Sequence, residues 1–209
     1  MKQRLPHHLY LSHSSHHFFS EFHHNRDGIP IVEFGATVTA NMEDVKSNFN
    51  SFDGIFLGLG GDSEVTLNNV EASYNSYGSS YGGVYVDTLL SPQDNNAELI
   101  LNGTNTVIGN EVYGFYARRD VNVVVSRGAT LNAYDNTGNG VQLDETTSSL
   151  TVKNGGAVNA CGNDGDLVGP GSSSFFPSDG KHYTCDDDVV DNGNGFTSCE
   201  NTCPVCTLN

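Results

Sequence analysis

The feature of this sequence that most limits its possible folds is a repeat of about 26 residues. Residues 150–163 (LTVKNGGAVNACGN) align with residues 123–136 (VVVSRGATLNAYDN) at an offset of 27, with matched glycine, asparagine and alanine positions. An asparagine followed four residues later by glycine, and then by two apolar residues one position apart, recurs at Asn50, Asn110 and Asn136, with a looser copy at Asn75. Such a fixed period is typical of architectures in which each unit stacks on the next.

Apolar and polar residues alternate within each unit, as in Leu99-Ile100-Leu101 and Leu150-Thr151-Val152. A period of two predicts β-strands, and Asn and Gly between the strands suit sharp corners. We therefore expect an all-β chain in which each unit forms a coil of three short strands, paired in parallel with the coils on either side. In this arrangement alternate residues fill a narrow core, namely Val84, Val86, Phe115, Ala117, Val141 and Leu143.

The repeated x-Val-x-Leu-x-Asn and Asn-x-x-x-Gly-Val-x-Leu patterns run from about Val38 to Val168. They resemble the right-handed parallel β-helix repeats of the pectin-lyase-like superfamily, including the coils of polymorphic outer-membrane and adhesin-type proteins. The resemblance implies a right-handed parallel β-helix solenoid of about five coils at residues 29–169, after a His-rich flexible tail at residues 1–28 and before an acidic, cysteine-rich segment at residues 170–209. Because this superfamily includes lyases, hydrolases, epimerases, adhesins and inert spacers, the resemblance specifies architecture and not function.

Charge and composition narrow the classes of partner. The formal net charge of −16 would repel nucleic acid and anionic membranes. The sequence has no apolar run near the ~20 residues of a membrane span, and its first residues lack the apolar core of a signal peptide. Five cysteines favour an oxidising compartment, so we expect an extracellular or cell-surface location. In that setting Asn102, in Asn-Gly-Thr, is a glycosylation acceptor.

The coil region offers one charged column in which catalysis could be sought. Enzymes of the resembled superfamily use grouped carboxylates with a basic residue, and residues 25–169 contain no histidine. Asp87, Arg118 and Asp144 each follow a corner glycine by four residues, which predicts that the arginine lies between the two aspartates on consecutive coils. We interpret this column as a charge-paired ladder that stabilises the stack, with a lyase-like site as the alternative.

Two further columns follow from the same register. Asn75, Asn110, Asn136 and Asn163 should stack at one corner, where we assign them a structural role as a hydrogen-bonded ladder. Phe56, Tyr85 and Tyr116 should face solvent as a stripe on which sugar rings could stack. The alternative for this stripe is that it reflects only β-propensity and cross-strand stacking.

The two ends of the chain carry possible metal ligands and cross-links. The histidines of the first segment indicate incidental metal affinity. For the cysteines we favour disulfides over zinc, among Cys161, Cys185, Cys199, Cys203 and Cys206. Calcium is the one cofactor that the sequence leaves open, at Asp186, Asp187, Asp188 and Asp191, although Val190 occupies a ligand position of the EF-hand pattern.

These observations favour a noncatalytic extracellular or cell-surface β-helix module for adhesion or carbohydrate contact, with a polysaccharide or a cell-surface glycan as partner. One alternative is a polysaccharide-active enzyme, which would be a lyase, hydrolase or epimerase. Another is a structural fragment of a longer repeat protein. Because both ends of a solenoid expose strand edges, we expect residues 25–39 to cover the first coil and the segment after Pro170 to cover the last.

Overall fold

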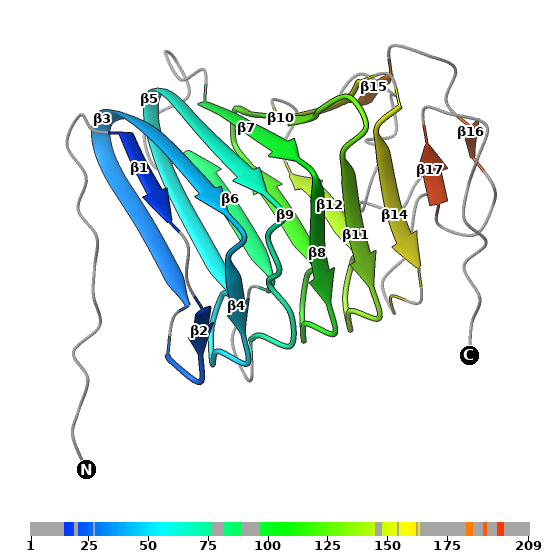
Figure 1. Ribbon diagram of the computed structural model, residues 1–209, viewed down its shortest axis with the longest axis horizontal. Coiled ribbons are helices and arrows are strands. Elements are labelled where there is room, and N and C mark those ends of the chain that lie inside the picture. The colour runs from blue at the N-terminus through cyan, green and yellow to red at the C-terminus, as the bar shows by residue number, and fades with distance from the viewer. Residues whose placement is uncertain are drawn as a thin grey trace.

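The computed structural model describes residues 15–18, 21–26, 28–76, 82–88, 97–144, 148–153, 155–161, 163, 183–185, 190–191 and 196–198. Every element within these ranges is a β-strand (Figure 1). The strands are β1 (Ser15–Phe18), β2 (Glu21–His23), β3 (Ile29–Glu43), β4 (Lys46–Asn48), β5 (Ile55–Asn68), β6 (Val84–Thr88), β7 (Ala97–Asn102), β8 (Thr104–Ile108), β9 (Phe115–Arg118), β10 (Val121–Val125), β11 (Thr130–Tyr134), β12 (Val141–Asp144), β13 (Ser149–Val152), β14 (Ala157–Cys161), β15 (Tyr183–Cys185), β16 (Val190–Asp191) and β17 (Phe196–Ser198).

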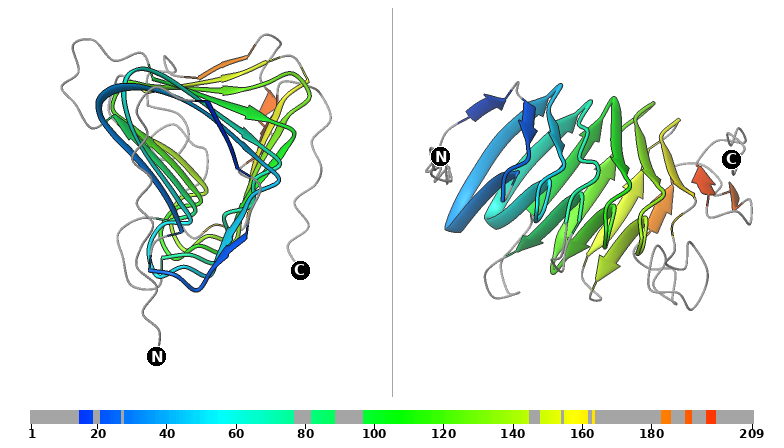
Figure 2. Two further views of the ribbon diagram at one scale, coloured as in Figure 1. Left: turned by 60° about the vertical axis from the view of Figure 1, so that its left-hand side comes forward. Right: turned by 90° about the horizontal axis from the view of Figure 1, so that it is seen from below.

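The strands wind into a parallel β-solenoid with three faces, and the coils project as a roughly triangular outline (Figure 2). The first face contains the starts of β3 and β5, followed by β6, β9 and β12. The second face contains the ends of β3 and β5, followed by β7, β10 and β13. The third face contains β2, β4, β8, β11 and β14, with Glu71 bridging β4 to β8. The all-β parallel solenoid predicted from the repeat is therefore confirmed.

The number of coils differs slightly from the prediction. Ile29, Ile55, Val84, Phe115 and Val141 occupy equivalent positions on the first face, so successive turns take 26, 29, 31 and 26 residues. The solenoid has about four turns instead of about five. The prediction gave each face of a coil its own short strand. In the first two coils, however, one long strand, β3 or β5, bends through the corner without a break and serves both the first and the second face. In β3 the bend coincides with register shifts between Val32 and Thr39.

The core is a continuous apolar column inside the coils. Side chains that alternate along each strand point inward, as the period of two requires. All six residues predicted for the core are at most 9% exposed, and they join Ile31, Leu57 and Leu99 from other coils. The sequence pattern therefore predicted correctly which residues point into the core. Burial of this column at ~25 cal/mol per Å² of apolar surface is the main force that holds the coils together.

Both ends of the solenoid are extended by strands from the terminal segments. β1 pairs in parallel with β3, and β2 pairs with β4, so residues 15–18 and 21–23, within the segment expected to be a tail, add strands to the sheets of the solenoid. Residues 29–39 are part of the first coil itself and do not form a separate cover over it. At the other end, β15 pairs with β13, and β17 pairs antiparallel with β14, as expected for a segment that covers the last coil.

In the ranges given above, the structure contains no helix with the length and hydropathy needed to cross a membrane.

Candidate functional site

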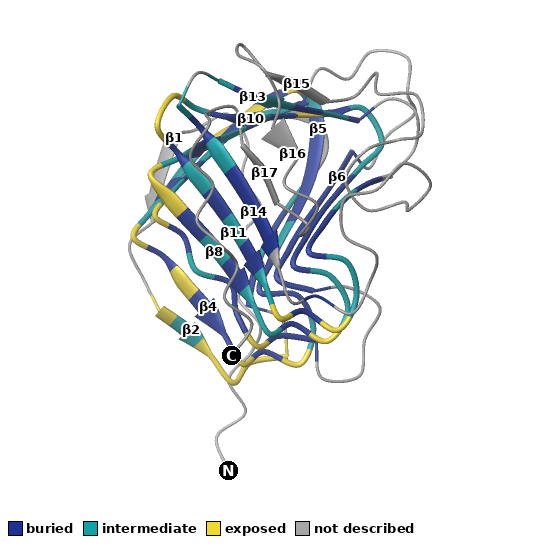
Figure 3. Cartoon of the chain, turned by 90° about the vertical axis from the view of Figure 1, so that its right-hand side faces the viewer, coloured by how far each residue is buried: buried dark blue, intermediate teal, exposed yellow. Residues whose placement is uncertain are grey.

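Each coil turns from the third face to the first face through the same two-residue corner. The first residue of the corner has a left-handed backbone, and the second is an asparagine. The left-handed residues are His24 (φ 55°), Phe49 (φ 56°), Tyr74 (φ 58°), Gly109 (φ 62°) and Asp135 (φ 52°). The asparagines that follow them are Asn25, Asn50, Asn75, Asn110 and Asn136. This corner lies at the ends of β2, β4, β8 and β11, where exposed positions gather (Figure 3).

The asparagines form a hydrogen-bonded column. Asn136 Oδ1 accepts from the backbone N–H of Asn110 at 3.0 Å and from Asn110 Nδ2 at 2.9 Å, while Asn136 Nδ2 donates to Val107 O at 3.1 Å and to Asn163 Oδ1 at 2.7 Å. The same two contacts to Oδ1 link Asn50 to Asn75 and Asn75 to Asn110. The structure thus places the four predicted asparagines in one column and extends it to Asn50. Because these amides are buried and their contacts saturate them, their role is to fix the corner.

Next to the asparagine column, three rings form an exposed stack, which we call the aromatic ladder: His24, Phe49 and Tyr74. The Phe49 and Tyr74 ring centroids are 5.1 Å apart with planes at 7°, and those of His24 and Phe49 are 5.7 Å apart at 22°. Phe49 is 50% exposed and Tyr74 48% exposed. Beyond Tyr74 the column continues with Gly109, over which the Tyr74 ring lies: a Cβ added at Gly109 would be 2.5 Å from Tyr74 Cε1.

Corner formation alone does not explain these rings. A left-handed backbone costs a residue other than glycine roughly 1–2 kcal/mol, so three such residues cost about 3–6 kcal/mol. The two ring stacks return only about 1–3 kcal/mol, at ~0.5–1.5 kcal/mol each. Gly109 and Asp135 occupy the same corner position in later coils, so the turn itself requires no ring. Bulky residues held in this backbone region point to a role for the exposed rings.

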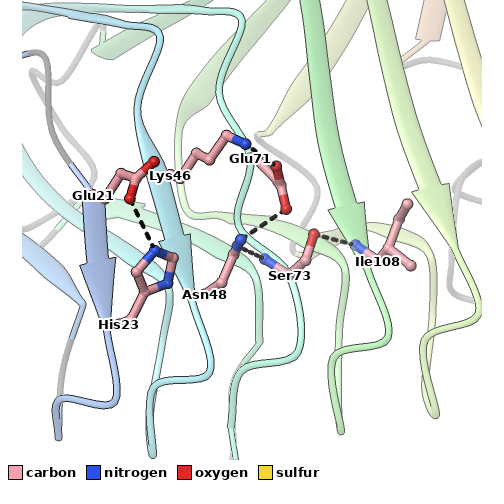
Figure 4. A network of polar contacts seen from close by, with 7 residues as sticks. All are labelled: Glu21, His23, Lys46, Asn48, Glu71, Ser73 and Ile108. Atoms are coloured by element: carbon pink, nitrogen blue, oxygen red, sulfur yellow. Dashed lines mark hydrogen bonds and ion pairs between the residues drawn. The ribbon is translucent and has the colours of Figure 1, made fainter.

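The third face carries a network of polar groups on the strands that lead to the ladder corner (Figure 4). Lys46 Nζ lies 3.5 Å from Glu71 Oε2, and Asn48 Nδ2 donates to Glu71 Oε1 at 2.7 Å. Closer to the corner, the backbone N–H of Ser73 donates to Asn48 Oδ1 at 2.8 Å. His23 Nε2 lies 3.6 Å from Glu21 Oε2. Such surface ion pairs contribute little stability, but they hold donors and acceptors at one strand spacing along the ladder.

The face continues past the ladder with further hydrogen-bonding groups. Thr106, Asn132 and Asn159 follow Glu71 in register on successive coils, and the Asn159 Nδ2 donates to Asn132 Oδ1 at 2.8 Å. The Tyr134 hydroxyl donates to Asn132 Oδ1 at 3.0 Å, and burial raises the pKa of the Tyr134 phenol. The third face is therefore a polar sheet bordered by the aromatic ladder at its corner.

The first face holds the aromatic column predicted from the sequence, but most of that column is not accessible. Phe56 stacks on Tyr85 at 5.3 Å and Tyr85 on Tyr116 at 5.2 Å, so the predicted column exists. However, Tyr85 is 4% exposed and Tyr116 8%, so the expectation that both face solvent is wrong. Neighbouring side chains contact both residues: the Tyr113 ring lies 4.8 Å from the Tyr116 ring, and the Tyr85 hydroxyl donates to Asp87.

The charged column on the first face has the predicted register, and Arg119, the residue after Arg118, also joins it. Asp87 and Asp144 are the strand partners of Arg118 on the two adjacent coils. Arg119 binds Asp87, with Nε donating to Oδ1 at 2.7 Å and Nη2 to Oδ2. The left-handed backbone of Arg119 (φ 49°) turns its side chain back toward Asp87. The hydrogen bonds that Arg119 donates to Asp87 raise the pKa of Arg119, and a hydrogen bond with Tyr85 raises the pKa of Arg118.

This arrangement leaves Asp87 poorly suited to acid–base chemistry. Its side chain is 3% exposed, and it accepts from the Tyr85 hydroxyl at 2.7 Å as well as from Arg119. A general base must reach a substrate proton directly or through one water. Asp87 instead acts as the centre of a structural cluster. The side chain of Asp144 lies outside the described part of the structure.

The other predicted sites fall mostly outside the described residues. Asn102 ends β7 next to Gly103 (φ 60°), at a corner of the solenoid. Cys161 lies in β14 and Cys185 in β15, and only the backbone of these two residues is described. Undescribed altogether are Cys199, Cys203, Cys206, Asp186, Asp187 and Asp188, and of Asp191 only the backbone in β16 is described. Among the described side chains, no group of three His, Cys, Asp or Glu is placed to hold a metal ion.

Sequence reasoning missed the aromatic ladder because the alternation of apolar and polar residues was followed within strands only. The available signal was the residue directly before each corner asparagine, which is His24, Phe49 or Tyr74 in three consecutive coils.

The solenoid agrees with the architecture implied by the resemblance, but its assignment to the pectin-lyase-like superfamily has no further support. No protein-family model, curated protein or solved structure matches this chain.

Proposed function

We propose that this protein is a noncatalytic extracellular or cell-surface module that binds carbohydrate along the aromatic ladder. The observation that carries the proposal is the exposure of Phe49 and Tyr74, stacked on consecutive coils beside a polar sheet. Large apolar side chains are seldom left half-exposed in a row unless they contact a partner. Because the rings are stacked on each other, a ligand would meet their solvent-facing edges and the outer face of His24.

A sugar chain fits this combination of surfaces. Pyranose rings carry apolar C–H groups and hydroxyls on the same small unit. The ladder supplies the apolar contact, and Glu21, Lys46 and Glu71 supply hydrogen-bonding groups one strand spacing apart. Because the solenoid backbone holds these groups in place before binding, little conformational entropy is lost on association.

The state of the first face favours binding over catalysis. Asp87 is buried in contacts with Tyr85 and Arg119, so the strongest candidate for acid–base chemistry is engaged within the protein. A polysaccharide lyase or hydrolase of this architecture would need such a group to be open to its substrate. The proposed function therefore does not use the first face.

Glycan-array binding tests the proposal, with the wild-type protein compared to Phe49→Ala combined with Tyr74→Ala. We expect binding to at least one glycan class, weakened about tenfold or more in the double variant, which corresponds to ~1.4 kcal/mol. Pectate, alginate and polygalacturonate incubated with the wild-type protein should release no reducing ends and no unsaturated products. Turnover of any of the three, or binding that is unchanged in the double variant, would contradict the proposal.

A further inference from the structure

The aromatic ladder lies among carboxylates. Glu71 precedes Tyr74 on the third face, and Glu21 lies two coils earlier in the same column, with its side chain 68% exposed. On the far side of the corner, the backbone N–H of Glu111 donates to Asn75 O at 3.1 Å, which places Glu111 beside the residue that follows Tyr74. Asp135 occupies the next left-handed corner position after Gly109. Acidic groups thus flank the ladder on both sides and at one end.

Among the described residues, Lys46 and Arg26 carry positive charge near the ladder. Lys46 lies against Glu71 at 3.5 Å, and the Arg26 guanidinium lies over the Phe52 ring at 5.0 Å from its centroid. The carboxylates named above outnumber these two cations, so the local balance is negative. The whole chain has a net charge of −16, so the long-range field has the same sign as the local one. A field of this sign raises the local concentration of cations and repels polyanions. Complementary charge mainly determines which partner is accepted and how fast it associates.

We infer that the aromatic ladder selects glycans that carry protonated amino groups, such as glucosamine chains, over neutral chains and over chains of uronic acids. This inference rests on the proposed carbohydrate-binding function. An ammonium group on the sugar would approach Glu111 and Asp135, while the ring C–H groups contact Phe49 and Tyr74.

The ligand series that tests the inference consists of oligomers of equal length of glucosamine, N-acetylglucosamine and galacturonic acid, measured by isothermal titration calorimetry with the full chain. We expect the tightest binding for the glucosamine oligomer and none for the galacturonate oligomer. Raising the salt concentration should weaken glucosamine binding and leave N-acetylglucosamine binding nearly unchanged, because only the first depends on charges that salt screens.

Two charge-matched variants separate a local effect from general attraction to an acidic protein. Glu111→Gln combined with Asp135→Asn removes two carboxylates at the ladder. Glu64→Gln combined with Glu98→Gln removes two from paired positions on the second face. The first variant should weaken glucosamine binding about twofold to tenfold, the range expected for two solvent-exposed ion pairs, and the second should leave it unchanged.

The outcomes distinguish this inference from the function on which it rests. Equal losses in the two variants would mean that the attraction is not local, and would overturn the inference. The inference would also be overturned if glucosamine and N-acetylglucosamine oligomers bound with equal affinity. If both then lost their binding in the Phe49→Ala and Tyr74→Ala double variant, the proposed carbohydrate-binding function would still stand. If no glycan of this series or of the array binds, both fail.

Discussion

The Tyr74 ring occupies the space where a side chain on Gly109 would begin, one coil further along the solenoid. A Cβ at Gly109 would be 2.5 Å from Tyr74 Cε1 and 2.6 Å from Tyr74 Cδ1. Glycine at this position therefore serves the corner in two ways: it adopts the left-handed backbone without strain, and it provides the surface on which the last ring of the aromatic ladder rests.

Gly109→Ala should destabilise the protein more than Gly128→Ala. Both glycines have a left-handed backbone (φ 62° and 69°), so both substitutions incur ~1–2 kcal/mol of strain. A Cβ at Gly128 meets no atom within 4 Å among the residues that the structure describes, whereas one at Gly109 displaces Tyr74 and loses a further ~1 kcal/mol of ring contact. Denaturant unfolding of the two variants measures the difference. Equal losses would mean that Tyr74 does not rest on Gly109.

Asn136→Ala should lower the free energy of unfolding by about 3–5 kcal/mol, because it removes four hydrogen bonds and leaves buried partners unsatisfied. Asn122→Ala is the matched control, since Asn122 is exposed on the second face and accepts only one described side-chain bond, from the Ser149 hydroxyl. It should cost less than ~1 kcal/mol. Glycan affinity of folded Asn136→Ala should match the wild type. A change in affinity without a loss of stability would show that the asparagine column binds ligand.

Asp87→Asn should lower the free energy of unfolding by about 2–3 kcal/mol. Removing one partner of a buried ion pair costs ~3–5 kcal/mol, and the value is reduced here because the Arg119 side chain is 34% exposed and is partly solvated after the substitution. A double-mutant cycle with Arg119→Gln measures the coupling directly. Additive effects of the two substitutions would show that the pair does not form in solution.

Alkaline pH should destabilise the wild-type protein more than it destabilises the Tyr134→Phe variant. Burial raises the pKa of Tyr134 above the ordinary value of 10.0, so folding favours the protonated phenol. This contribution to stability is complete below pH 10.0 and is lost as the pH rises through the folded-state pKa. Unfolding curves at a series of pH values across this range measure the two slopes. Identical slopes would mean that the Tyr134 hydroxyl ionises as readily in the folded protein as in the unfolded one.

Much of the fold could be predicted because a solenoid repeats its own register. The recurrence of asparagine and glycine fixed which residues stack, so the inward set around Phe115 and the pairing of Asp87 with Arg118 followed from counting residues. The long strands β3 and β5 could not be predicted in the same way. Their bend occurs within a strand, at a register shift that counting along the repeat does not reveal.

The candidate site was harder to predict because it depends on side-chain packing across coils. Tyr85 and Tyr116 point away from the core and are nevertheless buried, with Tyr113 against the Tyr116 ring and Asp87 at the Tyr85 hydroxyl, and alternation in the sequence does not report such contacts. The ion pair of Asp87 was assigned to Arg118 on strand register alone, whereas the left-handed backbone of Arg119 brings the next residue to it. Corner positions such as Phe49 follow neither strand nor helix periodicity.

Titration calorimetry with the tightest-binding glycan tests whether the aromatic ladder is the binding surface. The ladder variant, Phe49→Ala with Tyr74→Ala, is compared with Ile100→Ala combined with Val124→Ala, which removes two adjacent outward apolar side chains from the second face. Thermal unfolding first establishes that both variants are folded. We expect the affinity to fall about tenfold or more in the ladder variant and to stay unchanged in the second-face variant. Wild-type affinity in the ladder variant, or an equal loss in both, would contradict the proposed function.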